Sequence, residues 1–151
     1  MSRAIQHLFD VPHWSIDLKG KQRELRIQRV DMSAFHLRLD PEPCTYQIRD
    51  WIALSQKNFG DYLQKKGITA KVQFLENILK GNILSFAKDL GWWIEQPVEV
   101  CLLDWNEPRV ISYKGNKLLS FDFRFESNVA LPNHIVLGKK VSLGYGVVRG
   151  E

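Results

Sequence analysis

The amino-acid sequence predicts an α+β fold in which an antiparallel sheet packs against one long helix. Apolar residues recur at three- and four-residue spacing over residues 68–91, as they do in an amphipathic helix. Over residues 117–126 apolar and polar residues instead alternate, which indicates a strand with one buried face. The apolar members of that alternation are Leu119, Phe121, Phe123 and Phe125. The long helix is the simplest element to cover this face.

The helix is expected to run from Ile68 to Gly91. A glycine at its end suits the left-handed conformation that commonly stops a helix. Before the helix, residues 44–51 alternate weakly and predict a strand. The polar segment from there through Gly67 is expected to be irregular.

Three further strand signals follow the helix. Residues 98–103 form a nearly continuous apolar run, and residues 109–113 and 117–126 flank a plausible tight turn. Residues 141–148 are compatible with a strand but rich in glycine. A strand, one long helix and three or four antiparallel strands are typical of a ferredoxin-like (RRM-like) sheet, with one face covered by the helix and the other free to meet a ligand.

The first part of the chain predicts a smaller set of extended elements. Residues 14–18 and 25–30 alternate on either side of a possible turn, which indicates a β-hairpin, and residues 35–39 read as another extended piece. Residues 4–9 fit the last turns of a helix. The clearest boundary is residues 40–43, where two prolines disfavour helix and remove backbone donors.

Composition excludes several classes of protein. The chain has 151 residues, 44% of them hydrophobic, and a net charge of +4, which is ordinary for a globular protein and unlike a collagen-like or disordered one. Every stretch without charged residues is shorter than the ~18 apolar residues of a membrane span, and the first residues do not predict a signal peptide. We therefore expect a soluble, cytoplasmic protein with no membrane partner. Cys44 and Cys101 have no neighbours at metal-ligand spacing and are expected to be reduced thiols.

The segment from His134 to Arg149 carries the strongest functional signal. Its three glycines allow positive φ angles and close approach to a ligand, while its cations and a tyrosine offer phosphate contacts and a stacking surface. This combination suits a phosphodiester backbone, and it lacks the pattern of a P-loop. The plainer alternative is a glycine-rich turn between two strands with solvated lysines. Trp51, Trp92 and Trp93 are further candidates for base stacking, although aromatic residues at element ends more often belong to a core.

Four motifs, in consistent order over residues 44–148, resemble the C-terminal half of the CRISPR RNA-processing endoribonucleases of the RAMP superfamily. The motifs are residues 46–59, 75–88 and 113–122, and residues 131–133 leading into 137–148. The resemblance implies two ferredoxin-like units, here a partial N-terminal unit at residues 1–41 and a C-terminal RNA-binding domain at residues 42–151.

The same resemblance implies binding to the repeat hairpin of precursor CRISPR RNA and cleavage without metal or cofactor. In that family the 2′-hydroxyl attacks the adjacent phosphate and leaves a 2′,3′-cyclic phosphate and a 5′-hydroxyl. The family's glycine-rich loop falls on Gly138, Gly144 and Gly146, with polar members Lys139, Lys140 and Ser142. The RNA-binding residues expected are Gly138, Lys139, Lys140, Ser142, Gly144, Tyr145, Gly146 and Arg149.

The catalytic residue is left unknown at this point. Members of that family usually carry a general-base histidine on or near the first helix of the first domain, and no position of this sequence matches it. Among the four histidines, His134 beside the glycine-rich loop is the best local candidate, with a surface loop histidine as the plainer interpretation.

Three functions therefore stay open. The resemblance favours a metal-independent endoribonuclease, and the alternatives are a non-catalytic RNA-binding subunit or split-enzyme half, and a protein-interaction module that has lost RNA binding. The N-terminal unit resembles the latter part of a ferredoxin-like domain. We therefore expect, besides the CRISPR repeat RNA, either a homodimer or a second polypeptide that completes this unit.

Overall fold

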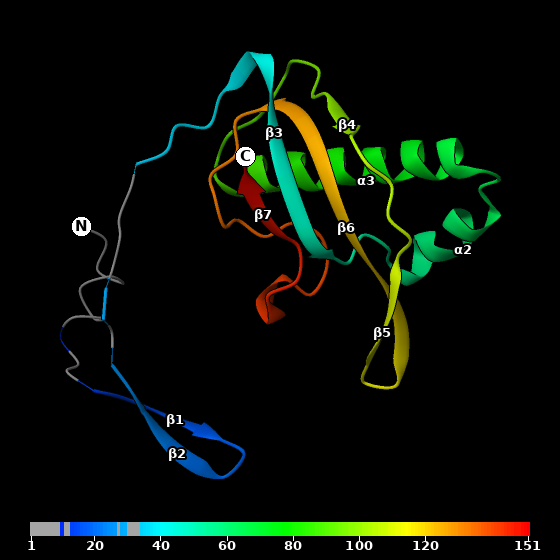
Figure 1. The fold of residues 1–151 in the computed structure, drawn as a ribbon. Coiled ribbons are helices and arrows are strands. Elements are labelled where there is room, and N and C mark those ends of the chain that lie inside the picture. The colour runs from blue at the N-terminus through cyan, green and yellow to red at the C-terminus, as the bar shows by residue number, and fades with distance from the viewer. Residues whose placement is uncertain (1–9, 11–12, 27, 30–33) are drawn as a thin grey trace. The chain divides into compact units, whose positions relative to one another are not determined.

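The computed structural model describes residues 10, 13–26, 28–29 and 34–151 (Figure 1). The chain divides into two units, Met1–Ala34 and Phe35–Glu151. In the first unit, β1 (Trp14–Leu18) and β2 (Lys21–Leu25) pair as an antiparallel hairpin. The predicted hairpin is confirmed, although its second strand comes earlier than residues 25–30. The helical turns expected at residues 4–9 lie outside the described residues.

The second unit holds a five-stranded antiparallel sheet with the strand order β4-β6-β3-β7, and β5 pairs with β6 outside this path. The two long strands, β3 and β6, lie side by side at its centre (Figure 1). Two helices, α2 and α3, follow β3 along the chain. The α+β class is therefore confirmed. The bounds are β3 (Leu39–Trp51), α2 (Gln56–Gln64), α3 (Ile68–Asp89), β4 (Val100–Leu102), β5 (Arg109–Tyr113), β6 (Asn116–Val129) and β7 (Val147–Gly150).

Helix α3 covers one face of the sheet, as predicted. Its buried side chains recur every four residues, and the alternating aromatic residues of β6 are buried as well. Each large side chain removed from water in this way contributes roughly 1.5–3 kcal/mol. The core residues that these two elements supply are Leu75, Leu79, Ile83, Ala87, Phe121, Phe123, Phe125 and Val129.

The segment before α3 differs from the sequence-based expectation of an irregular stretch. It contains α2, which begins after an N-cap at Ser55 whose side chain and that of Asn58 form a capping box. Only Tyr62 of this helix is buried. The apolar side chains of this nine-residue helix are Phe59, Tyr62 and Leu63, at helical spacing but over about one turn, which is too short a pattern to predict a helix.

The two prolines at residues 40–43 do not divide the structure. Pro41 and Pro43 lie inside β3, where both side chains are exposed, and the unit boundary instead follows Ala34. The pairing of β3 with β6 shifts register between Leu39 and Cys44, so the missing proline donors fall where ladder bonds are interrupted. The strand expected at residues 98–103 is also shorter, because only Val100–Leu102 is paired.

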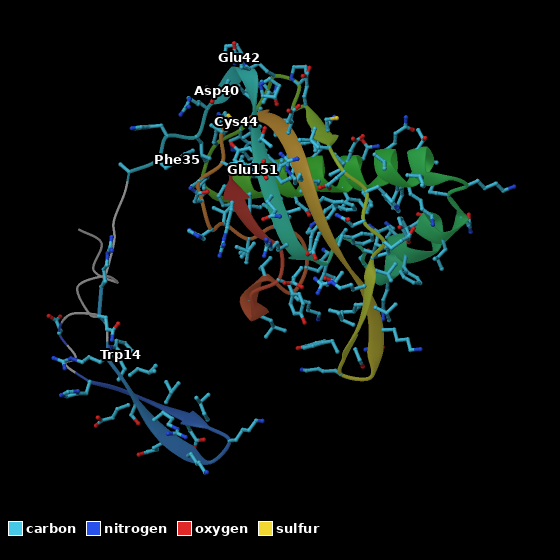
Figure 2. The ribbon with its side chains drawn as sticks, viewed as in Figure 1. Trp14, Phe35, Asp40, Glu42, Cys44 and Glu151 are labelled. Carbon is cyan, nitrogen blue, oxygen red and sulfur yellow. The ribbon has the colours of Figure 1, made fainter. Side chains whose placement is uncertain are left out.

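The C-terminal residue extends the pairing of β7 with β3. Glu151, labelled in Figure 2, donates its backbone N–H to the carbonyl of Thr45, and its carboxylate accepts hydrogen bonds from Arg124 of β6. The tail expected as a strand at residues 141–148 is instead a 3₁₀ turn, η1 (Val141–Leu143), followed by β7. Cys44 and Cys101 are both free thiols. In the part of the chain that the structure describes, no helix is long and apolar enough to cross a membrane.

Candidate functional site

The glycine-rich segment, residues 137–146, crosses the end of β3 and is held there by backbone hydrogen bonds. The N–H of Lys139 donates to the carbonyl of Ile52 at 2.9 Å, and that of Leu137 donates to the carbonyl of Gly146 at 2.9 Å. The N–H of Gly146 is shared between the carbonyls of Arg49 and Asp50, at 3.1 Å each. Satisfied backbone groups of this kind fix the path of a loop.

Left-handed backbone angles shape this segment. Gly138, Gly144 and Gly146 have φ of +98°, +84° and +75°, and Lys140 has φ of +60°. A β-carbon on Gly138 would lie 2.6 Å from Nε1 of Trp51, whereas one on Gly144 would meet open space. Glycine is therefore required by packing at the first position. At Gly144 only the backbone angle favours it, and the main chain stays open to a ligand.

A strained corner in β3 provides the carbonyls that hold Gly146. Asp50 has φ of +53°, and its N–H donates to Oδ1 of Asp122 at 2.7 Å. Nη2 of Arg109 lies 2.8 Å from both Asp50 Oδ1 and Asp122 Oδ2. Exposed ion pairs add little stability, so the role of this group is positional. It keeps the Arg49 and Asp50 carbonyls turned toward the glycine-rich segment.

The lysines of the segment meet the tip of the β5–β6 hairpin. Lys139 and Lys140 are exposed, and Nζ of Lys140 lies 4.6 Å from the ring centroid of Tyr113. Nζ of Lys114 lies 5.6 Å from the same ring. A cation above an aromatic ring is held by about 0.5–1 kcal/mol at an exposed site. The structure thus gathers two ammonium groups near one aromatic side chain. Sequence reasoning missed Tyr113, because the turn at residues 114–117 signalled the hairpin but not the loop that its tip would meet.

A hollow of about 300 Å³ opens between this hairpin, the lysines and the start of α2. We call it the hairpin pocket. Its apolar wall comes from the segment after β3 and from β6, and its rim comes from the hairpin and the glycine-rich segment. The residues that define it are Ile52, Leu54, Tyr113, Leu118, Lys139 and Lys140.

The other residues predicted for RNA binding are placed differently. Arg149 lies on β7 opposite Gln47 of β3, and both line a separate hollow of about 180 Å³ together with Arg49. Ser142 is exposed within η1, and Tyr145 is half-buried. The predicted set is thus spread over two surfaces, and only its lysines line the hairpin pocket.

His134 lies just before residues 135–137, which pair with the start of β7. It is therefore at the end of this pairing that is away from the glycine-rich segment. Its N–H donates to the carbonyl of Val148 at 2.8 Å, and its φ of +66° is left-handed. The imidazole is exposed, and within the described residues it makes no hydrogen bond or ion pair. Across the same residues, no group of three or more His, Cys, Asp and Glu side chains could hold a metal ion.

The three tryptophans proposed for base stacking differ in how far they are buried. Trp51 is fully buried, and its Nε1 donates to Oδ1 of Asn82 at 3.1 Å, so it belongs to the core. Trp92 packs partly buried against that core. Trp93 is 70% exposed, with Nζ of Lys88 at 4.8 Å from its ring. Only the last of these has a ring face accessible to a nucleic acid.

Comparison with known proteins shows consistent matches. A family model described as the Cas6b C-terminal domain matches residues 38–150. An uncharacterized protein of Methanocaldococcus jannaschii is 43% identical over 107 residues, which are 69% of this chain and 70% of that protein.

Two solved structures resemble the chain. A crystal structure of Cas6b has 24% identity and a TM-score of 0.83, and the match covers 98% of this chain and 66% of the solved one. A crystal structure of a CRISPR RNA processing endoribonuclease, also Cas6b, has 27% identity and a TM-score of 0.71, covering 90% of this chain and 66% of the solved one. The chain thus spans slightly less than two thirds of either solved protein.

Proposed function

Because this chain belongs to the family of Cas6b C-terminal domains, we propose that it binds CRISPR repeat RNA and takes part in metal-independent cleavage of precursor CRISPR RNA. A solved protein 27% identical to it is a CRISPR RNA processing endoribonuclease. Within the chain, the observation that carries the proposal is the exposed pair Lys139 and Lys140, presented by a segment whose backbone is pinned to β3.

The RNA backbone is proposed to lie along the glycine-rich segment. Lys139 and Lys140 supply ammonium groups, and Gly144 leaves its main chain uncovered. Hydrogen bonds from cations to phosphate oxygens are shorter and stronger than neutral ones, and each phosphate contact releases counterions. Ser142, Tyr145 and Arg149 complete the proposed RNA surface. Gly138 and Gly146 serve it indirectly, because they shape the loop.

We propose a ferredoxin-like arrangement for residues 42–151. A βαββαβ unit of this type has four antiparallel strands, and the order β4-β6-β3-β7 corresponds to its order with β3 as first strand and β7 as last. Residues 130–146, whose only helical element is the 3₁₀ turn η1, occupy the place of the second helix. This correspondence supports the proposal and explains why the glycine-rich segment lies at an end of the sheet. The partial unit expected at residues 1–41 rests on the family resemblance alone, and its last residues, 39–41, belong to β3 of the second unit.

The cleavage step proposed is an internal transesterification. The 2′-oxygen of one ribose forms a bond to the adjacent phosphorus as the bond from phosphorus to the leaving 5′-oxygen breaks. A base takes the 2′-hydroxyl proton, and an acid returns a proton to the 5′-oxygen. Lys139 or Lys140 would stabilise the charge that gathers on the phosphoryl oxygens. His134 is the proposed proton acceptor within this chain.

The deciding experiment uses 5′-labelled repeat RNA from the same genome, incubated with the full chain in excess EDTA and separated on a denaturing gel. Cleavage to a 2′,3′-cyclic phosphate end supports the endoribonuclease. Salt-dependent binding without cleavage supports the non-catalytic subunit or split-enzyme half. Absence of binding at low salt would overturn the RNA function and favour a protein-interaction module.

A further inference from the structure

The hairpin pocket has the size and lining of a site for one small planar group. Its volume of about 300 Å³ is at the lower end of the range for ligand sites, roughly 300–1,000 Å³. Leu118 and Tyr113 are half-buried and expose apolar surface to the pocket, whereas the lining residues Ile52 and Leu54 are almost entirely buried. An apolar wall of this kind attracts the flat face of a base once it leaves its stack.

The pocket lining also includes polar side chains that could pair with the edge of such a base. The side-chain amides of Gln56, at the start of α2, and Asn116, at the start of β6, both line the pocket and are exposed. An amide offers both donors and acceptors, so it can pair with the edge of a base. The hydroxyl of Ser55 is already engaged in the capping box with Asn58.

The charge around the pocket favours an anion. Lys139 and Lys140 stand at its rim, and no carboxylate is among the described residues that line it. Two other hollows do contain carboxylates, Asp89 in one and Asp50 in the other. The contact with the Tyr113 ring holds the Lys140 ammonium at this rim, so Tyr113 acts as a positioning residue.

We infer that the hairpin pocket holds one unpaired base of the bound RNA, with the neighbouring phosphate on Lys139 and Lys140. An apolar wall, amide edges and a cationic rim together match a single nucleotide. This inference rests on the proposed RNA binding. It adds to it a place where the protein reads one base rather than the backbone alone.

The test compares the effect of abasic substitutions in the RNA on binding to the unmodified protein and to two matched variants. Each unpaired nucleotide of the repeat RNA is replaced in turn by an abasic residue, and the dissociation constant is measured for the full chain. Gln56→Trp fills the pocket from an exposed position, and Gln64→Trp makes the same change at the exposed end of the same helix. Circular dichroism and thermal melting check that both variants fold. Tyr113→Leu, with Tyr113→Phe as its control, provides a second pair that does not depend on filling the pocket.

We expect one abasic position to weaken binding to the unmodified protein about tenfold, as removal of a stacked base does. That penalty should vanish in Gln56→Trp and persist in Gln64→Trp. Tyr113→Leu should reduce it, and Tyr113→Phe should keep it. No sensitive position, or equal penalties in both tryptophan variants, overturns the inference while RNA binding stands. Absence of all RNA binding instead overturns the proposed function and the inference with it.

A second arm separates an RNA base from a free nucleotide. Nucleoside 5′-monophosphates are titrated into the unmodified protein and into Gln56→Trp by calorimetry. We expect them to bind far more weakly than the RNA, because a mononucleotide lacks the other phosphates of the RNA backbone. Tight binding of a mononucleotide that Gln56→Trp abolishes, combined with an abasic scan without a sensitive position, would assign the pocket to a free nucleotide and overturn the inference.

Discussion

Gly146 lies directly against the carbonyl group of Leu137, so closely that a β-carbon on the glycine would overlap the carbonyl oxygen. The same two residues are joined by a hydrogen bond from the N–H of Leu137 to the carbonyl of Gly146, at 2.9 Å. This contact holds the two ends of the glycine-rich segment, Leu137 and Gly146, close together. Gly144, two residues earlier, has a similar left-handed φ but no atom near its missing side chain.

The two glycines are therefore expected to respond differently to alanine. Gly146→Ala should lower the free energy of unfolding by more than about 3 kcal/mol, because backbone must move. Gly144→Ala should cost only the strain of the left-handed angle, about 1–2 kcal/mol. Urea unfolding of both variants measures the difference. For RNA binding, Gly144→Val is expected to weaken affinity more than its decrease in stability explains, and equal decreases would favour a purely structural role for this glycine.

The paired lysines should control the salt dependence of RNA binding. Replacing Lys139 and Lys140 by alanine leaves up to two phosphates without a cation, so the slope of log affinity against log salt should flatten by about one unit for each such phosphate. Fluorescence anisotropy over a series of salt concentrations gives the slope. The matched control is Lys65→Ala with Lys66→Ala, another exposed consecutive pair, located after α2. If the two double variants share one slope, the RNA path lies elsewhere.

Two buried tyrosines provide a stability test with opposite outcomes. The hydroxyl of Tyr46 donates to the carbonyl of Val129 and accepts from the N–H of Leu131. The hydroxyl of Tyr62 is buried and has no partner among the described residues. Tyr46→Phe should therefore cost about 1 kcal/mol at neutral pH, whereas Tyr62→Phe should be neutral or slightly stabilising.

The same pair predicts how stability changes at high pH. Burial raises the pKa of Tyr46 from 10.0 to about 12, and burial also raises the pKa of Tyr62. A raised pKa in the folded state means that the stabilisation is complete below pH 10 and is lost as the pH rises toward 12. The free energy of unfolding should fall over that interval, and the fall should be smaller in Tyr46→Phe. A fall of equal size in that variant would show that other groups cause it.

His134 is the informative position for chemistry. If its imidazole takes the 2′-hydroxyl proton, His134→Ala should slow cleavage by about 10²–10⁴-fold and leave the RNA dissociation constant nearly unchanged. Single-turnover gels in EDTA measure the rate, and His36→Ala, another exposed histidine of the second unit, is the control. Full activity in His134→Ala would remove this residue from the mechanism. Activity that EDTA abolishes would remove the metal-independent mechanism itself.

The elements with long runs of periodic apolar residues could be predicted from the sequence. The features that could not be predicted have a short pattern or depend on pairing between distant strands. Helix α3 and strand β6 each bury a regular set of side chains, so the pattern alone gives the element and its buried face. Helix α2 has apolar residues at helical spacing only over residues 59–63, so its pattern was too short to predict it. The prolines at positions 41 and 43 suggested a boundary because their tolerance inside β3 depends on a register shift that only pairing with β6 creates.

The site shows the same division between local and long-range information. Glycines and lysines marked the segment at residues 137–146, because their conformational freedom and charge are local properties. Tyr113 and Gln56 have no local property of this kind that would identify them as site residues from the sequence. They join the hairpin pocket only because a hairpin tip and the start of a helix, each distant in sequence, meet the lysines in the folded unit.

The first unit leads to the last prediction, that the chain associates with another polypeptide. Among the described residues its β1–β2 hairpin pairs with no third strand, and within it Trp14, Leu18 and Leu25 are exposed. A two-stranded hairpin by itself is only marginally stable in water. Its unpaired strand edges and apolar side chains favour pairing with a further strand, and burial of apolar surface adds about 25 cal/mol per Å². We therefore expect a homodimer, or a complex with a second polypeptide that completes this unit.

Sedimentation equilibrium at micromolar concentration, with and without repeat RNA, measures the association. Replacing Trp14 and Leu18 together by serine should weaken it, because the apolar side chains that drive it are removed. The matched control replaces Val110 and Leu63 by serine, since both are exposed apolar residues of the second unit. Association that persists equally in both variants would move the interface away from the hairpin. A strictly monomeric chain whose residues 13–26 resist protease would contradict the partner prediction, because the hairpin would then be stabilised without a second polypeptide.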